Sequence, residues 1–205
     1  LVAFESKDTK QILNSMLQCI ENCVEGVNVK TLSTFDVDYI FTKVRAKSVG
    51  ESIEVNVTCP DDNKTSVQVS VDLDTIKVKK NRKHTDTIKL DDTLSLKMKY
   101  PSMDQFIENN FDFEMAAPNE SVSAAMSMLS SCIDMIYDEE ESWDASESTK
   151  EELDEFIDQL NTKQFQEVEE FFKTMPKLSH TLKVTNPQTG VESEVVLEGL
   201  ASFFS

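Results

Sequence analysis

Apolar residues recur with helical spacing in several parts of the chain. Within residues 36–48, Val37, Ile40 and Val44 lie three or four positions apart, which places them on one face of a helix. Gly50 follows, and glycine is a residue at which helices commonly end. The same spacing predicts further helices over residues 8–24, 102–110, 121–137, 149–160 and 162–175.

Other segments have the two-residue period of β-strands. Residues 53–57 alternate between apolar and polar, turn residues occupy 59–64, and residues 67–71 alternate again, which predicts a β-hairpin. Alternation within residues 76–98 predicts further strands of the same small sheet. Residues 178–197 predict a second hairpin near the C-terminus.

These elements predict an α+β fold in which helices flank a small antiparallel β-sheet, with a C-terminal αα-hairpin and β-hairpin. We divide the chain into consecutive segments: an N-terminal helical segment (1–50), an antiparallel β segment (51–101), a helical segment (102–137), an acidic linker (138–148), and the C-terminal αα-hairpin, β-hairpin and apolar tail (149–205).

Composition narrows the function classes. The 205 residues carry a formal net charge of -18, which argues against binding to nucleic-acid phosphates and favours solubility or a basic protein partner. No apolar run approaches the roughly 20 residues that span a membrane. The four cysteines lack the dense spacing of a disulfide framework, which suits a reducing compartment.

Charged residues are concentrated in two places. Residues 134–158 contain twelve Asp or Glu against one Lys, and we interpret residues 138–148 as a solvated linker, with a docking surface for a basic partner as the alternative. The carboxylates lack the spacing of an EF-hand calcium loop, and the sequence around them does not indicate the shaped pocket of a glycosidase. The basic residues 79–84 predict a solvated hairpin tip, or a contact with an acidic partner or with the chain's own acidic segment.

Candidate chemistry is sparse. Cys19 and Cys23 lie on one helical turn, but no zinc-like spacing supplies further ligands, and His180 has no nearby nucleophile. We therefore predict no catalytic, cofactor-binding or metal-binding residues. Met and Phe side chains also suit adaptable protein-binding surfaces, and the candidates for partner contacts are Met126, Met128, Phe171, Phe172, Phe203 and Phe204.

Two blocks of sequence carry a resemblance. Residues 35–51, with the following strand residues and 69–73, and residues 163–204 together resemble the T-even phage baseplate hub subunit family. Members of that family have a β-rich segment before the first helix, so we expect the chain to begin inside the family's leading helix.

The resemblance implies a non-enzymatic protein needed for assembly of the baseplate hub in a contractile tail, acting as an assembly chaperone or as a hub component. The implied partners are other hub or tape-measure proteins, with no nucleic acid, no membrane and no cofactor. The implied location is the host cytoplasm during tail assembly, or the tail baseplate of the virion. One alternative is an acidic DNA mimic that binds a host DNA-binding factor, and another is an enzyme that uses carboxylates or cysteine.

Overall fold

The computed structural model describes residues 9–108 and 122–204, and these residues divide into two compact units. Within the described part, unit 1 consists of residues 9–29, 35–79 and 176–204, and unit 2 consists of residues 30–34, 80–108 and 122–175. Each unit has a hydrophobic core of its own, and the helices and antiparallel strands confirm the predicted α+β class.

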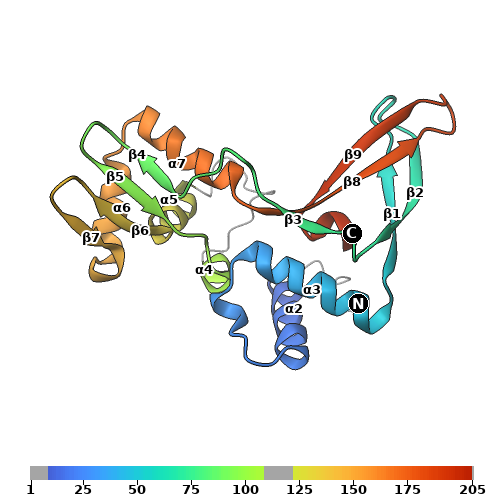
Figure 1. Cartoon of the computed structure of the whole chain (residues 1–205), viewed down its shortest axis with the longest axis horizontal. Helices are drawn as coiled ribbons and strands as arrows, with labels where there is room; N and C mark the ends of the chain where they lie inside the picture. Colours follow the sequence, from blue (N-terminus) through green and yellow to red (C-terminus); the bar gives the residue numbers. More distant parts are fainter. Residues whose placement is uncertain (1–8, 109–121, 205) are drawn as a thin grey trace. The chain divides into compact units, whose positions relative to one another are not determined.

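The helices of unit 1 follow the predicted periodicity closely. Helix α2 spans Thr9–Cys23, and helix α3 spans Thr34–Val49 (Figure 1). The short helix α8 (Ala201–Phe204) lies near the C-terminus, and the short 3-10 helix η1 (Val29–Thr31), of which residues 30 and 31 belong to unit 2, precedes α3 in the sequence. Gly50 follows α3 with a φ of 140°, which an L-residue rarely adopts, so it ends the helix directly before the hairpin.

Strands β1 (Ser52–Thr58) and β2 (Ser66–Asp72) form the predicted antiparallel hairpin. The predicted single sheet differs from the structure, because β3 (Lys77–Lys79) pairs with β8 (Lys177–Thr185) and not with β2. The turn after β2 redirects the chain, since the Asp72 carboxylate accepts a hydrogen bond from the backbone N–H of Asp74. Strand β9 (Glu192–Glu198) completes a three-stranded sheet of order β3-β8-β9, which includes the predicted C-terminal hairpin.

The core of unit 1 is formed by the apolar sides of both hairpins and by three helices. Its buried residues are Met16, Ala46, Val55, Val57, Val71, Leu73, Ile76, Leu178, Leu182, Val184, Leu197, Leu200 and Phe203. Alternation along each strand directs the valines and leucines inward and leaves Glu, Thr and Gln on the exposed sides.

Unit 2 contains a four-stranded antiparallel sheet of order β4-β5-β6-β7 and several helices. The strands are β4 (Thr87–Lys89), β5 (Ser95–Met98), β6 (Ile133–Tyr137) and β7 (Ser142–Asp144). The helices are α4 (Met103–Glu108), α5 (Val122–Ser131), η2 (Ala145–Glu147), α6 (Lys150–Asp158) and α7 (Thr162–Thr174). The predicted start of α5, at residue 121, lies outside the described residues.

One predicted helix continues too far. We predicted a helix through residue 137, but α5 ends at Ser131 and the next residues form β6. The cause is an irregularity in the β5–β6 register, which places Met98 opposite Ile133 and Lys97 opposite Met135, so that Asp134 is left out of the pairing. A bulge of this kind brings residues three apart onto one side of a strand, and in the sequence that spacing imitates a helix.

The predicted acidic linker also differs from the structure, because residues 138–148 form a turn, a strand and a 3-10 helix within unit 2. The Asp138 carboxylate accepts hydrogen bonds from the backbone N–H groups of Glu140 and Glu141, at 2.8 and 2.7 Å. Strand β7 then pairs with β6, and the Asp144 carboxylate caps η2. Local hydrogen bonds between side chain and backbone therefore order a segment whose composition alone suggests disorder.

The predicted αα-hairpin is present as α6 and α7. Thr149 and Glu152 form a capping box at the start of α6. Helix α7 begins with a second capping box between Asn161 and Gln164, and Pro176 follows its end. The core of unit 2 lies between these helices, α5 and one face of the sheet, and its buried residues include Ile88, Leu96, Met128, Leu129, Cys132, Ile133, Leu153, Ile157, Val168, Phe171 and Phe172.

Candidate functional site

The residues predicted to bind a partner lie in two different cores. Met128, Phe171 and Phe172 belong to the core of unit 2, where their exposed fractions are 1%, 2% and 6%, and half-buried Met126 packs against that core. Phe203 is buried in the core of unit 1, and the side chain of Phe204 lies outside the described residues. The structure assigns a packing role to the buried side chains, and their contact with a partner stays a prediction.

Phe171 also contributes to an aromatic cluster that the sequence did not indicate. The His84 ring lies against Phe171 and Tyr100, with ring centroids 5.1 and 5.6 Å away. Tyr100 Oη lies 2.9 Å from His84 Nε2, and Thr174 Oγ1 lies 3.0 Å from His84 Nδ1. The Thr174 hydroxyl donates to the carbonyl of Glu170, at 2.6 Å, so it accepts the proton of Nδ1 and leaves Nε2 to accept from Tyr100.

This hydrogen-bond pattern holds His84 in its neutral form. Burial lowers the pKa of His84, and the nearby carboxylate of Asp86 opposes the shift. Both ring nitrogens of His84 are hydrogen-bonded to side chains of the same unit, and its ring packs against Phe171 and Tyr100. We therefore assign His84 to the packing of the loop before β4 against α7.

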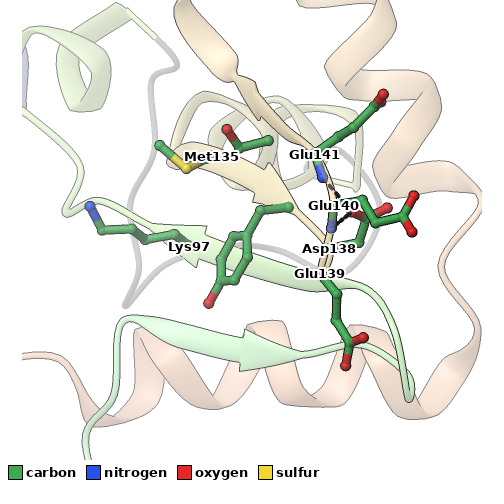
Figure 2. A pocket seen from close by; sticks show the side chains of 8 residues that line it. Lys97, Met135, Asp138, Glu139, Glu140 and Glu141 are labelled. Carbon is green, nitrogen blue, oxygen red and sulfur yellow. Dashed lines mark hydrogen bonds between the residues drawn. The ribbon is translucent and has the colours of Figure 1, made fainter.

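The face of the unit 2 sheet that points away from its core is the candidate interaction surface. Successive residues of a strand point to opposite faces, and Leu96 and Ile136 point to the core, so Lys97, Met135 and Tyr137 lie on the other face. Met135 and Tyr137 are half-buried and belong to neither hydrophobic core of the described residues. Lys97 and Met135 are among the residues that line an open hollow of about 430 Å³, and their side chains are drawn in Figure 2.

Four consecutive carboxylates, Asp138 to Glu141, border this hollow (Figure 2). The backbone N–H groups of Glu141 and Glu140 stabilise the charged form of Asp138 and lower its pKa. Lys97, on the opposite side, is engaged by Asp134, with 2.8 Å between Nζ and Oδ2, and this contact raises the pKa of Lys97. Among the described residues, no cation forms an ion pair with the side chains of Glu139, Glu140 or Glu141.

Strand β7 is an edge strand of this sheet, because within the described part of unit 2 it pairs only with β6. All three of its residues are exposed, and Trp143, at 44% exposure, is the only tryptophan in the chain. An edge strand presents unpaired backbone N–H and C=O groups that can pair with another extended chain. The acidic turn, the apolar side chains of β6 and an open edge therefore meet at one end of the sheet.

The predicted basic loop is exposed and has no ion pair with the acidic turn among the residues that the structure describes. Lys80, Arg82 and Lys83 are exposed, while His84 is anchored as described above. A second open hollow, of about 540 Å³, lies between this loop and the sheet and shares Lys97 with the first. The contact of the basic loop with an acidic partner stays a prediction.

The cysteines and acidic residues offer no metal centre within residues 9–108 and 122–204, where no three His, Cys, Asp or Glu side chains converge to hold an ion. All four cysteines are free. Cys59 and Cys132 are buried, and burial raises the pKa of the Cys132 thiol to about 12. In the same residue ranges, none of the helices has both the length and the apolar character needed to cross a lipid bilayer.

The fold and the open sheet surface define a scaffold built from two small α+β units. The family model described as T4 bacteriophage base plate protein matches residues 1–205, and the chain belongs to this family. Membership confirms the resemblance read from the sequence and gives the chain a structural or assembly role among phage baseplate proteins, with other baseplate proteins as its contacts. No curated protein and no solved structure gave a significant match.

Proposed function

We propose that the chain is a non-enzymatic protein needed for assembly of the baseplate hub, acting as an assembly chaperone or as a hub component through contacts with hub or tape-measure proteins. The observation that carries the proposal is the family match over residues 1–205. Two features of the described residues support it: each unit has its own core, and unit 2 has an open sheet face and edge.

The polar groups of the candidate surface suit contact with a protein better than catalysis. The carboxylates of residues 139–141 are exposed on a turn, and that of Asp138 is used by the turn itself. General acid and base residues instead act in a shaped site that holds the substrate against them. The proposed location is the host cytoplasm while tails assemble, and the hub of the finished tail if the chain is retained.

Particle composition tests the proposal. Infected cells that lack this chain should accumulate no complete hubs, and complementation with the intact chain should restore them. Mass spectrometry of hub precursors and of purified mature tails then separates the two roles, because a chaperone occurs only in precursors and a component occurs in both. Normal hub formation without the chain would overturn the proposal.

The DNA-mimic alternative predicts instead that the purified chain competes with DNA for a host DNA-binding protein.

A further inference from the structure

We infer that the β7 edge and the adjoining outer face of the unit 2 sheet form a docking surface for an extended basic segment of a partner protein. The inference rests on the proposed function, because it specifies the chemistry by which the chain recognises a baseplate partner. It concerns residues 135–144, which include an open edge strand, half-buried apolar side chains and an acidic turn.

The geometry of the edge favours an extended partner segment. The backbone N–H of Asp138 donates to the carbonyl of Glu141, at 2.9 Å, and this bond closes the turn between β6 and β7. In an antiparallel pair, hydrogen-bonded positions alternate with positions whose backbone groups point away from the partner strand. The backbone N–H and C=O groups of Trp143 therefore point to β6, while those of Ser142 and the N–H of Asp144 point to the open edge. The carbonyl of Asp144 belongs to the start of η2, because Asp144 is the N-cap of that helix. A further strand added there would continue the sheet.

The two sides of β7 differ in character, and this difference specifies the side chains of the segment. Asp144 lies opposite Met135 on the outer face, near the acidic turn, whereas Trp143 lies opposite Ile136 on the side of the sheet that carries the core. Neighbouring strands place their side chains in register on each face. A docked strand would therefore carry Lys or Arg on the outer face and apolar residues beside Trp143, alternating along its length.

Charge selects a basic segment. Glu139, Glu140 and Glu141 form no ion pair with any described residue, and Lys97 is already engaged by Asp134. The whole chain carries a formal net charge of -18, which attracts a basic segment and repels an acidic one. The same net charge disfavours a second copy of this chain as the occupant.

Trp143 provides a direct probe, because it is the only tryptophan in the chain. The intact protein is titrated with three capped eight-residue peptides that alternate Val with Lys, Val with Ser, or Val with Glu, and tryptophan emission is recorded. We expect a saturable shift of the emission with the Lys peptide, and much weaker changes with the Ser and Glu peptides. A higher salt concentration should weaken the binding of the Lys peptide, because salt screens exposed ion pairs.

The matched variants change the same number of charges at different places. In the site variant, residues 139–141 carry the substitutions Glu139→Gln, Glu140→Gln and Glu141→Gln. In the control variant, the exposed glutamates of β9 carry Glu192→Gln, Glu194→Gln and Glu198→Gln. We expect the site variant to bind the Lys peptide about tenfold more weakly, as the loss of three exposed ion pairs would give, and the control variant to bind as the parent does.

Several outcomes would overturn the inference. These are no emission shift with the Lys peptide, equal weakening in both variants, or equal binding of the Ser peptide. The proposed function fails independently, since its test is hub formation in cells that lack the chain. If the site variant restores hub formation as well as the parent chain does, the docking surface is wrong while the assembly role stands.

Discussion

Asp61 accepts hydrogen bonds from the side-chain amide of Asn186, which lies 125 positions later in the sequence, and both carboxylate oxygens are 3.0 Å from Asn186 Nδ2. The hydroxyl of Thr189 donates to the same carboxylate, at 2.6 Å. Asp61 lies in the turn between β1 and β2, and Asn186 begins the turn between β8 and β9. These hydrogen bonds therefore join the turns of the two hairpins of unit 1.

This contact predicts a pH dependence of stability. The hydrogen bond from Thr189, followed by that from Asn186, lowers the pKa of Asp61. A carboxyl group whose pKa is lower in the folded state stabilises the fold above its unfolded pKa of about 4, and this stabilisation is lost as the pH falls through the folded pKa. We expect Asp61→Ala to lower the midpoint of thermal unfolding at pH 7, and the difference from the parent to shrink below about pH 4.

Thermal unfolding of both proteins between pH 7 and pH 3 checks this prediction, with Asp92→Ala as the control. The Asp92 side chain is fully exposed, and its closest cation, Lys89 Nζ, lies 3.9 Å away. A difference between Asp61→Ala and the parent that stays constant over the whole pH range would contradict the assignment.

A second contact joins the helix and the hairpin of unit 1. Lys43 Nζ of α3 lies 3.1 Å from the carbonyl oxygens of Leu73 and Asp74 and 3.3 Å from Asp74 Oδ1, and it also lies over the Tyr39 ring. Lys43→Met keeps most of the apolar stem but leaves these acceptors unpaired. We expect a loss of about 1–2 kcal/mol in the free energy of unfolding, which urea denaturation measures.

The control for this substitution is Lys173→Met. Among the described residues, the Lys173 ammonium forms one ion pair, with Glu169 on the exposed side of α7, and a surface pair of this kind is worth about 0.5 kcal/mol or less. Equal effects of the two substitutions would show that the bonds to the carbonyls of the turn do not stabilise the hairpin.

Two of the predicted partner-binding residues allow packing to be separated from binding. Phe171→Ala and Phe203→Ala each remove a buried ring, and a loss of about 3–5 kcal/mol is expected for such a cavity. Because the two rings lie in different cores, hydrogen exchange should show faster amide exchange in unit 2 for the first variant and in unit 1 for the second.

Phe203→Leu tests the binding role with less damage to the fold, because leucine fills much of the same space. We expect this variant to keep its cooperative unfolding transition. If it then recovers hub proteins from infected cells as the parent chain does, Phe203 acts through packing. Reduced recovery by the folded variant would support the predicted contact with a partner.

Sequence patterns were sufficient where structure is set by neighbouring residues. The α3–β1–β2 segment follows from local periodicity, and the capping box at Thr149 follows from two residues three positions apart. The pairing of β3 with β8 was not predictable, because Lys77 and Ser179 are far apart in the sequence and either strand is compatible with several neighbours. Strand β6 was missed because its bulge spaces the inward residues as a helix would.

The same reasons explain how much of the candidate surface could be predicted. The sequence favoured a solvated linker at residues 138–148 and offered a docking surface for a basic partner as the alternative, which stays a prediction. The contribution of Met135 and Tyr137 was not recognised, because a helix was predicted there and a helix would not align these residues with Lys97. The sequence therefore identified the charge of the surface, and the sheet was needed to supply its shape.

A last prediction concerns Asp38, which lies on α3 and whose carboxylate accepts a hydrogen bond from the backbone N–H of Leu200, directly before α8. Burial raises the pKa of Asp38 to about 7, and the hydrogen bond with Leu200 only partly opposes the shift. A carboxyl group whose pKa is raised on folding destabilises the fold as it ionises, so stability from this group is lost as the pH rises from about 4 to about 7. Asp38→Asn keeps an acceptor for the backbone N–H and removes the charge of a half-buried side chain. We expect the variant to unfold at a higher temperature than the parent at pH 8 and at the same temperature near pH 4, and the exposed neighbour Asp36→Asn to show no such trend. A pH-independent difference between Asp38→Asn and the parent would contradict the assignment.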